Sequence, residues 1–428
     1  MQDTNIVEQM RAEWNERARE DAYYYVAFGR KDQDDDEFFS TAADVVRALE
    51  VELKRLPAAD PQSRRALEIG CGPGRLMRPM SRHFAEIHGV DVSDEMIRLA
   101  REKLHNTPNA FPTLVDGASL ACYESEFFDY VYSYAVFQHI PSRDVVFSYL
   151  AEARRVLKPG GILRCQINGL PATARQYTTW EGVRVSAREV AEFACANDFQ
   201  FLAIEGAGTQ YMWVTLRKRP AGWFQVLAGA PPLAVARIYN IVNAHSDELV
   251  VTSRGRFAWM SIWIDNLPDD CDLNQINIEV DGRQAAPVYI GARKVNAQMP
   301  PGARTGLLPV DVYWFGERLC ETAWVRVTPP GPPVPRLTAV SDGVNLLAGP
   351  VIFSRTVKLF LEELAAPERL EVRLDGAPVP DLDPFCTDPV NESYEVNFRL
   401  PDSVAAGAHA VELKLGSRQF PQVGIEVR

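Results

Sequence analysis

The sequence predicts an α/β domain with a mostly parallel sheet and one antiparallel edge hairpin, followed by two all-β sandwich domains. Three observations support this prediction. Short apolar runs alternate with amphipathic helical runs from Ala66 to Leu216, a pattern typical of a parallel sheet with helices on both faces. Helical periodicity largely ends after Lys218. The strand-rich remainder contains two similar segments roughly 100 residues apart, the size of one β-sandwich domain.

The composition argues against several classes of partner and indicates the cellular compartment in which we expect the protein. The chain has 428 residues, is 46% hydrophobic and carries a formal net charge of −12. Nucleic acids and anionic membranes attract clustered Lys and Arg, so we expect neither as a partner. No apolar stretch reaches the roughly 20 residues of a membrane span, and Met1–Asn5 lacks the pattern of a signal peptide. The seven cysteines are scattered without a C-x-x-C pair, so we expect no metal site, no disulfide framework and a cytoplasmic location.

Two helices are expected before the first strand, as an N-terminal helical cap over residues 1–60. An apolar stripe at four-residue spacing predicts the first helix over residues 5–22. Its members are Ile6, Met10, Trp14 and Ala18. The acidic run Asp32–Glu37 is interpreted as a solvated loop. The second helix is expected over Phe38–Leu56.

The α/β domain is expected over residues 61–218. Its predicted parallel strands are Ala66–Ile69, Ala85–Val90, Phe111–Val115, Phe128–Ser133 and Ile162–Ile167. Its predicted helices are Leu76–His83, Asp94–Leu104, Asp144–Leu157 and Ala187–Ala196. Pro159-Gly160-Gly161 predicts a turn into the last parallel strand. Phe199–Glu205 and Tyr211–Leu216 are close enough in sequence to form the antiparallel hairpin.

Residues 219–330 and 331–428 are expected to form the two β-sandwich modules. The repeated segments are Ile276–Val288 with Leu370–Leu382, and Val295–Gly316 with Val396–Gly416. Each copy contains an Asp-Gly pair, Asp281-Gly282 or Asp375-Gly376, which predicts a tight hairpin because both residue types tolerate positive φ. Prolines punctuate the connector before the first module, at Pro220, Pro231 and Pro232. The proline-rich run Pro329–Pro335 predicts an extended spacer.

The segment with the most chemical information is Ala66–Leu76, ALEIGCGPGRL. A buried strand ends at Ile69, and a glycine-rich turn leads into a helix. Gly70 and Gly72 allow the backbone to approach a ligand without a Cβ clash. The helix that starts near Gly74 directs free N–H groups and a positive dipole end to the same place. Such a turn suits a ligand with a carboxylate and ribose hydroxyls.

Nicotinamide-dependent oxidoreductases also use a glycine-rich turn, with the spacing G-x-G-x-x-G/A. Here the sixth position is Arg75, which would crowd a pyrophosphate, and the third glycine, Gly74, lies one residue early. The pattern that begins at Glu68 is instead E-x-G-x-G-x-G. It resembles motif I of class I S-adenosylmethionine (SAM)-dependent methyltransferases.

Further blocks resemble the same family in the same order, and the resemblance covers about residues 14–218. The blocks are Ala85–Ser93, Leu114–Leu120, Phe128–Ile140 and Arg154–Leu163. The resemblance implies a Rossmann-like, seven-stranded methyltransferase domain with S-adenosyl-L-methionine as its cofactor.

The resemblance also implies the residues that hold the cofactor. Glu68 would order the motif I loop, Asp91 would accept hydrogen bonds from the ribose hydroxyls, and Asp116 would take the adenine amine. The alternatives are a purely structural Glu68, a solvated strand-end Asp91 and a turn-forming Asp116. The complete implied set is Glu68, Gly70, Cys71, Gly72, Gly74, Asp91, Val92, Asp116, Gly117, Ser133 and Tyr134.

Two residues are candidates for catalysis. His139 follows the fourth strand on the acceptor side and could be a general base or a residue that bridges loops. As a base, its replacement by Gln should lower turnover strongly while cofactor affinity survives. The segment Trp14–Gly29 resembles a leading segment that folds over the cofactor pocket in some family members. Its Tyr24, between Tyr23 and Tyr25, could face the sulfonium or belong to a packed helix-end cluster.

The leading hypothesis is a methyltransferase that acts on a small molecule or a glycan by in-line displacement. The alternative is a SAM-binding scaffold protein. The C-terminal modules weakly resemble Ig-like (IPT-type) bacterial modules and are candidates to bind a glycan, a protein or a second subunit. Four tryptophans in the first module could form a binding platform or strand cores: Trp259, Trp263, Trp314 and Trp324.

Overall fold

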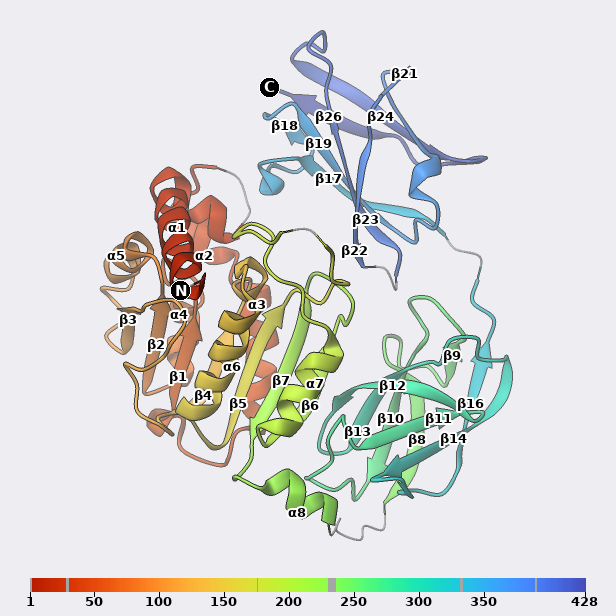
Figure 1. The fold of residues 1–428 in the computed structure, drawn as a ribbon. Coiled ribbons are helices and arrows are strands. Elements are labelled where there is room, and N and C mark those ends of the chain that lie inside the picture. The colour runs from red at the N-terminus through yellow and green to blue at the C-terminus, as the bar shows by residue number, and fades with distance from the viewer. Residues whose placement is uncertain (1, 28–30, 175, 230–235, 332–333, 389–390) are drawn as a thin grey trace. The chain divides into compact units, whose positions relative to one another are not determined.

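The computed structural model describes residues 2–27, 31–174, 176–229, 236–331, 334–388 and 391–428 (Figure 1). The chain divides into two compact units. The first unit comprises Met1–Glu16 and Ala42–Pro330, and the second comprises Arg17–Thr41 and Gly331–Arg428. Helix α1 (Gln2–Ala27) therefore contributes residues to both units. The domains 1–60, 61–218, 219–330 and 331–428 stay predictions.

A mostly parallel sheet forms the centre of the first unit. In the order β3-β2-β1-β4-β5-β7-β6, the strands from β3 to β5 are parallel, whereas β7 runs antiparallel to β5 and β6. The predicted antiparallel hairpin is therefore confirmed, but it is not an edge, because the sheet continues beyond β6. The strands are β1 (Arg65–Ile69), β2 (Glu86–Asp91), β3 (Ala110–Leu114), β4 (Phe128–Ser133), β5 (Leu157–Ile167), β6 (Phe199–Glu205) and β7 (Met212–Lys218).

Helices cover both faces of this sheet (Figure 1). Successive side chains of a strand point to opposite faces, and β1 shows the consequence: Leu67 joins one hydrophobic core and Ala66 the other. The first core contains side chains of α6 and α7, and the second contains those of α3, α4 and α5. The helices are α3 (Ala43–Glu50), α4 (Met77–Met80), α5 (Asp94–Lys103), α6 (Arg143–Val156) and α7 (Ala187–Ala196).

Serine side chains fix where three of these helices begin. Ser93 accepts a hydrogen bond from the Met96 N–H at the start of α5, and Ser142 does the same for α6. Ser186 forms a capping box with Glu189 at the start of α7. Each cap satisfies a backbone N–H that has no partner inside the helix, so local sequence sets these boundaries.

The N-terminal segment differs from the prediction in two places. The expected helix over Phe38–Leu56 is divided into α2 (Asp35–Ser40), α3 and a 3-10 turn over Val51–Arg55. The acidic run is not all loop, because Asp34 caps α2 in a capping box with Glu37. Acids in a first helical turn are favourable beside the positive end of the helix dipole, and this explains the acidic cluster.

The last parallel strand begins earlier than predicted. β5 starts at Leu157, and Pro159-Gly160-Gly161 lies inside it as a bulge rather than before it as a turn. Phe128 pairs with Leu157 and Tyr130 with Ile162, so the single residue between them on β4, Asp129, faces four residues of β5. The Asp129 carboxylate holds this bulge by accepting from the Lys158 ammonium at 2.8 Å.

The first β module follows a short helix, α8 (Trp223–Gly229), that lies inside the predicted connector; Pro231 and Pro232 lie outside the described residues. Its sheets, β8-β10-β13-β12 and β12-β11-β14-β16-β9, enclose one hydrophobic core. The strands are β8 (Arg237–Asn243), β9 (Val250–Thr252), β10 (Trp259–Asp265), β11 (Ile276–Val280), β12 (Arg283–Ile290), β13 (Lys294–Gln298), β14 (Gly306–Trp314), β15 (Glu317–Arg318) and β16 (Ala323–Thr328).

The second β module has two separate sheets around one core: β17-β19-β23-β22 and β18-β26-β24-β20-β21. Of the spacer before it, Pro332 and Pro333 lie outside the described residues. The strands are β17 (Arg336–Asp342), β18 (Val351–Ile352), β19 (Thr356–Glu362), β20 (Leu370–Leu374), β21 (Ala377–Pro378), β22 (Asp383–Asp388), β23 (Ser393–Arg399), β24 (Gly407–Leu415), β25 (Arg418–Gln419) and β26 (Val423–Val427).

The two modules have matching strand pairings. The short second strand, β9 or β18, pairs in parallel with the last strand, β16 or β26. The Asp-Gly pairs lie between β11 and β12 and between β20 and β21, as predicted. Asp281 and Gly282 have φ of 52° and 70°, and Asp375 and Gly376 have 49° and 80°. Positive φ at both central residues is the conformation that this hairpin turn requires.

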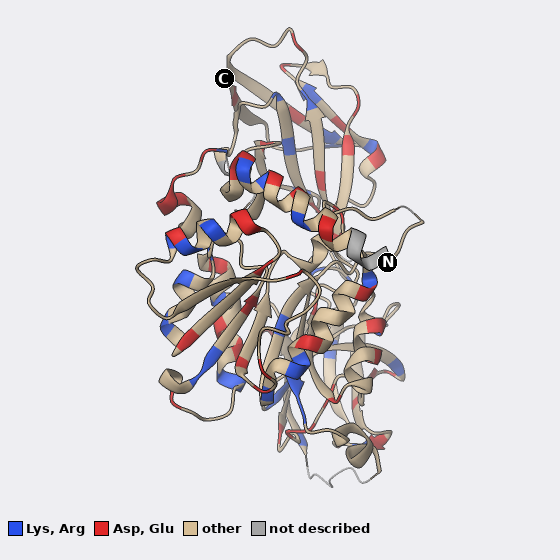
Figure 2. Ribbon diagram, turned by 60° about the vertical axis from the view of Figure 1, so that its left-hand side comes forward, with Lys and Arg blue, Asp and Glu red and all other residues tan. Residues whose placement is uncertain are grey.

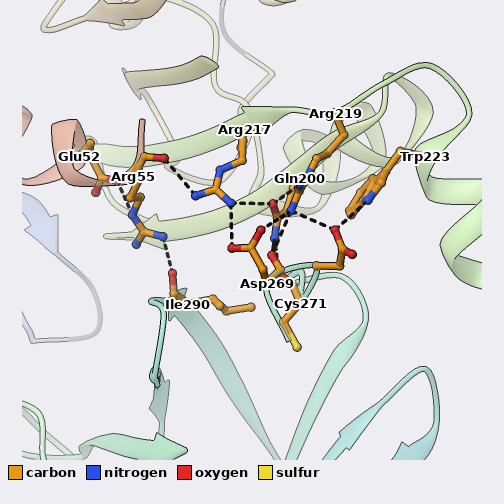
Figure 3. A network of polar contacts seen from close by, with 10 residues as sticks. Glu52, Arg55, Gln200, Arg217, Arg219, Trp223, Asp269, Cys271 and Ile290 are labelled. Atoms are coloured by element: carbon orange, nitrogen blue, oxygen red, sulfur yellow. Dashed lines mark hydrogen bonds and ion pairs between the residues drawn. The ribbon is translucent and has the colours of Figure 1, made fainter. Parts of the chain in front are cut away.

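The first β module is joined directly to the edge of the parallel sheet (Figure 3). Tyr289 of β12 pairs with Ala203 of β6, so the sheet continues past β6. Beside this pairing, the Gln200 amide donates to the backbone oxygens of Asp269 and Cys271, both at 2.7 Å. Buried backbone and amide groups that satisfy each other in this way make the module an extension of the sheet within the first unit.

Charges are spread over the elements, with Lys and Arg interleaved with Asp and Glu (Figure 2). Among the described helices, none is both long and apolar enough to cross a bilayer.

Candidate cofactor and acceptor site

The glycine-rich loop after β1 is fastened to the end of β2. The N–H groups of Gly70 and Cys71 both donate to the Val90 carbonyl, at 2.8 and 3.0 Å. Gly70, Gly72 and Gly74 all have positive φ, at 74°, 50° and 88°, which only glycine adopts at little cost. The loop therefore has a fixed, glycine-dependent shape beside the carboxyl ends of the parallel strands, where ligands bind in open α/β sheets.

Packing within the protein also requires two of these glycines to lack a side chain. A Cβ on Gly70 would lie 2.3 Å from a methyl group of Val136, and a Cβ on Gly74 would lie 2.7 Å from Leu104. Sequence reasoning assigned the small size of Gly70 to close approach of a ligand. The structure shows that packing against the segment after β4 already requires it.

Asp91, at the end of β2, has both carboxylate oxygens directed at backbone donors. Oδ2 accepts from the Gly72 N–H and Oδ1 from the Ser93 N–H, each at 2.9 Å. Burial raises the pKa of this carboxyl although the two hydrogen bonds act in the opposite direction. A carboxylate has about four acceptor positions, so Asp91 keeps capacity for the hydroxyls of a ribose while it orders the loop.

Glu68 is buried in β1, where Tyr132 donates its hydroxyl to Oε2 at 2.9 Å. Burial raises the pKa of Glu68 to about 8, against the opposing effects of the Tyr132 hydrogen bond and the Arg75 charge. Ser133, on the neighbouring strand, is also buried and donates to the Ile69 carbonyl at 2.8 Å. Tyr132 and Ser133 thus brace the end of β1 from the side of β4.

The residues predicted around the adenine lie at the ends of β2 and β3. Asp116 is exposed, and its Oδ1 accepts from the N–H groups of Ala118 and Ser119 at 3.0 and 2.9 Å. Asp116 therefore forms a turn through Oδ1, a conformation that both interpretations of this residue allow. A Cβ on Gly117 would lie 2.7 Å from Val92, which brings these two predicted residues together.

A stack of aromatic and cationic side chains lies after the end of β4, and the sequence did not predict it. Tyr134, just after β4, stacks on Trp213 of β7 with ring centroids 5.6 Å apart. The Arg75 guanidinium lies 5.5 Å from the Tyr134 ring centre, and that of Arg164 lies 4.7 Å from Trp213. The antiparallel placement of β7 creates this contact, and no local pattern in the sequence indicates it.

His139 is buried between two tryptophans rather than open to solvent. Its Nδ1 lies 3.0 Å from the Trp180 carbonyl, and its ring meets Trp14 edge-on at 5.4 Å. Gly182 donates to the Gln138 carbonyl at 2.7 Å, so the loop after β5 is pinned to the turn that carries His139. These contacts join His139 and its turn to the loop after β5.

Tyr24 and Cys71 are the remaining predicted residues. Tyr24 belongs to the second unit, where the Lys31 ammonium lies 5.5 Å from its ring. Cys71 is buried in the loop, and burial raises the pKa of its thiol. Among the described residues, no group of three or more His, Cys, Asp or Glu side chains could hold a metal ion.

The four tryptophans of the first β module do not share one face. Trp314 is a core residue, Trp259 and Trp263 lie on β10, and Trp324 is 59% exposed on a strand of the other sheet. A joint aromatic platform is not present.

Helix α1 contributes residues that sequence reasoning missed. Arg11 donates to the backbone oxygens of Val92 and Val115, and Asn15 accepts from the Ser93 hydroxyl at 2.7 Å. These three contacts join residues 78 to 104 positions apart, so only the folded structure reveals them.

Comparison with known proteins agrees with this geometry. Residues 67–165 match the family model described as a methyltransferase domain. A phosphoethanolamine N-methyltransferase 2 from Caenorhabditis elegans is 28% identical over 161 residues, which cover 36% of each chain. A trans-aconitate 2-methyltransferase from Variovorax paradoxus is 28% identical over 251 residues, 57% of this chain and 86% of that protein.

Among solved structures, Haemonchus contortus phosphoethanolamine N-methyltransferase 2 in complex with S-adenosyl-L-methionine is 27% identical over 38% of each chain, with a TM-score of 0.31. The chain spans little more than a third of the length of the phosphoethanolamine enzymes that it matches. The match with the family model covers the glycine-rich loop together with Asp91 and Asp116. Residues 67–165 therefore form a methyltransferase domain, and its cofactor is S-adenosylmethionine.

Proposed function

We propose that this chain transfers a methyl group from S-adenosylmethionine to a small organic acceptor. One observation carries the proposal: the Asp91 carboxylate binds the Gly72 N–H, so the glycine-rich loop and the ribose-binding acid form one ordered unit inside a methyltransferase domain. A degenerate loop kept only for folding would not need a half-buried acid with spare acceptor capacity directed into it.

The residues present fit the cofactor by their donor and acceptor chemistry. Asp91 offers acceptors to ribose hydroxyls, and Asp116 offers its second carboxylate oxygen to an adenine amine. Val92 and Gly117 supply an apolar edge and a backbone N–H for the base. The remaining proposed cofactor residues are Glu68, Gly70, Cys71, Gly72, Gly74, Ser133 and Tyr134.

The bound cofactor supplies a methyl group that is already electrophilic, because it is attached to a sulfonium. The chain therefore has to align an acceptor lone pair with that group and exclude water. We assign this task to Tyr134, which stacks on Trp213, and to Trp14 and Trp180, whose rings both contact His139.

We assign His139 to the acceptor side as a residue that holds loops together, with general-base action as its second candidate role. Its Nδ1 contact with the Trp180 carbonyl fixes the ring, and Gln138 Nε2 lies 3.4 Å from its Nε2. When His139 Nε2 accepts a hydrogen bond from the Gln138 amide, it is a weaker base, and this supports the bridging role. Tyr24 remains a candidate for the cofactor or acceptor side.

The finer structural assignments are part of the same proposal. The sheet order supports a Rossmann-like, seven-stranded catalytic domain, and two sheets around one core support Ig-like sandwiches. The seven cysteines are free thiols, as in a cytoplasmic protein. The modules are candidates to bind a glycan, a protein or a second subunit, and a glycan remains an alternative acceptor.

The experiment that tests the proposal has two steps. Isothermal titration with S-adenosylmethionine and S-adenosylhomocysteine measures binding, and no heat for either at millimolar concentration would refute it. Incubation with methyl-labelled cofactor and a metabolite extract then measures label transfer, with Asp91→Asn as the matched variant of reduced cofactor affinity. Binding without transfer to any metabolite or glycan fraction would favour the SAM-binding scaffold instead.

A further inference from the structure

Helix α1 reaches the two strand ends that carry the candidate cofactor acids. Arg11 donates from Nε to the Val92 carbonyl at 3.2 Å and from Nη2 to the Val115 carbonyl at 3.1 Å. Val92 directly follows Asp91, and Val115 directly precedes Asp116. One guanidinium therefore joins the chain beside the ribose acid to the chain beside the adenine acid.

This bridge lies just beyond the last backbone hydrogen bonds between β2 and β3. The pairing of β2 with β3 ends at Asp91 opposite Leu114. One further backbone hydrogen bond, from the Val115 N–H to the Asp91 carbonyl at 3.0 Å, follows. Beyond it the chain turns at Gly117, with φ of 97°. The Arg11 side chain is thus the next link between the strand ends.

The same face of α1 holds a second contact. Asn15, one turn after Arg11, accepts from the Ser93 hydroxyl at 2.7 Å and from the Glu95 N–H at 3.1 Å. Residues four apart lie on one helix face, so the helix is anchored over the end of β2 at two points. Arg11 consequently approaches its two carbonyls from a fixed helix, and its rigid planar fork suits two acceptors at once.

We infer that Arg11 is a positioning residue of the cofactor site: it sets the spacing between Asp91 and Asp116, and thereby the fit of the adenosyl group. The inference rests on the proposed function, because it concerns the same site. It makes α1 a part of that site rather than a cover over it.

The test compares Arg11→Ala and Arg11→Lys with the unchanged protein in calorimetric titrations. The ligands are S-adenosylhomocysteine and 5′-methylthioadenosine, which keeps the adenosyl group and lacks the amino acid. Arg11→Ala should weaken both by the same factor, on the order of tenfold, the loss expected for a charge-assisted hydrogen bond. Arg11→Lys, with one point donor, should give an intermediate loss. Arg19→Ala, an exposed arginine of the same helix, is the matched control and should bind normally.

The outcomes separate this inference from the proposed function. Absence of binding by the unchanged protein would refute the proposed function and the inference together. Normal binding by Arg11→Ala or full affinity in Arg11→Lys would overturn only the inference. A loss for S-adenosylhomocysteine without a loss for 5′-methylthioadenosine would also overturn it, since the adenosyl half would then be unaffected. If Arg11→Ala fails to fold, Arg11→Lys decides the question by itself.

Discussion

Asp91 and Gly72, 19 residues apart in sequence, are joined by a 2.9 Å hydrogen bond from the Gly72 N–H to Oδ2 of the carboxylate. The other oxygen, Oδ1, accepts from the Ser93 N–H at the start of α5. One acid therefore controls the shape of the glycine-rich loop and the beginning of the next helix. Its structural and binding roles should be separable by substitution.

Asp91→Asn keeps the size of the side chain and replaces one oxygen by an amide NH₂. That NH₂ faces a backbone N–H, so one buried donor loses its acceptor, which costs about 1–3 kcal/mol of unfolding free energy. Affinity for S-adenosylhomocysteine should fall at least tenfold, because the ribose hydroxyls lose a charged acceptor. Urea unfolding and calorimetric titration measure the two effects. Unchanged affinity would remove Asp91 from the cofactor site.

Asp116→Asn should weaken the binding of S-adenosylhomocysteine and leave the stability of the protein nearly unchanged. Asn caps the same kind of turn as Asp, and the N–H groups of Ala118 and Ser119 should keep its amide oxygen, so stability should stay within about 0.5 kcal/mol. The amide NH₂ then faces the place where the adenine amine would donate. S-adenosylhomocysteine should bind more weakly, whereas S-inosylhomocysteine, which lacks that amine, should bind no worse. Equal losses for the two ligands would contradict an adenine contact.

Glu68 should make the stability of the protein depend on pH. Burial raises its pKa from 4.5 to about 8 in the folded state, so between these values the folded protein holds a proton that the unfolded chain releases. Stability is therefore highest below pH 4.5 with respect to this group and falls as pH rises towards 8. The slope from one such group is at most about 1.4 kcal/mol per pH unit.

Glu68→Gln removes this titration and keeps an acceptor for the Tyr132 hydroxyl. Its unfolding free energy should decline less between pH 5 and pH 8.5 than that of the unchanged protein, and it should be the more stable of the two at pH 8.5. Glu124→Gln, at an exposed site, is the control and should follow the unchanged protein. Parallel curves for Glu68→Gln and the unchanged protein would show that Glu68 is ionised in the fold.

The features that sequence predicted correctly depend on residues close together in the chain. The glycine-rich turn, the acids that end β2 and follow β3, and the Asp-Gly hairpins are local patterns whose backbone conformations few residues adopt. Their positions in the structure agree with the predicted elements. The break after Ser40 was missed because apolar periodicity continues across it, and α3 packs its own face on the sheet.

Contacts between distant segments could not be predicted in the same way. The Arg11 bridge, the stack of Tyr134 on Trp213 and the pairing of β6 with β12 each depend on how elements pack. Asp129 is another example, because its hydrogen bonds to the Arg65 N–H and Lys158 stabilise a bulge that proline and glycine alone suggested was a turn. In these cases the tertiary packing determines which residues come into contact, and local sequence patterns do not reveal it.

His139→Asn distinguishes the two roles of this histidine. The Asn NH₂ can replace the Nδ1–H donor to the Trp180 carbonyl, but it cannot accept a proton. If His139 bridges loops, His139→Asn should keep most of its turnover and stability, while His139→Ala loses the hydrogen bond and should be destabilised. Turnover and thermal unfolding of both variants check this. A fall in turnover of 100-fold or more in His139→Asn, with normal cofactor affinity, would instead assign general-base catalysis to it.

The attachment of the first β module should depend on a buried acid, Asp272. Its carboxylate accepts from the Phe201 N–H on β6 and from the Asn274 N–H at 2.7 Å, and the side chain is fully buried. Asp272→Ala leaves the buried Phe201 N–H without an acceptor, at about 1–3 kcal/mol, and the half-buried Asn274 N–H loses its acceptor as well. Amide hydrogen exchange along β6 should accelerate, because the edge of the parallel sheet loses its contact with the module.

Asp269→Ala is the matched control at the same junction. Asp269 forms ion pairs with Arg217 and Arg219, but its side chain is 80% exposed, and exposed ion pairs contribute about 0–1 kcal/mol. Exchange along β6 should therefore stay close to that of the unchanged protein. If the two variants exchange alike, the buried carboxylate does not hold the junction, and the pairing of Tyr289 with Ala203 together with the Gln200 amide must carry the attachment.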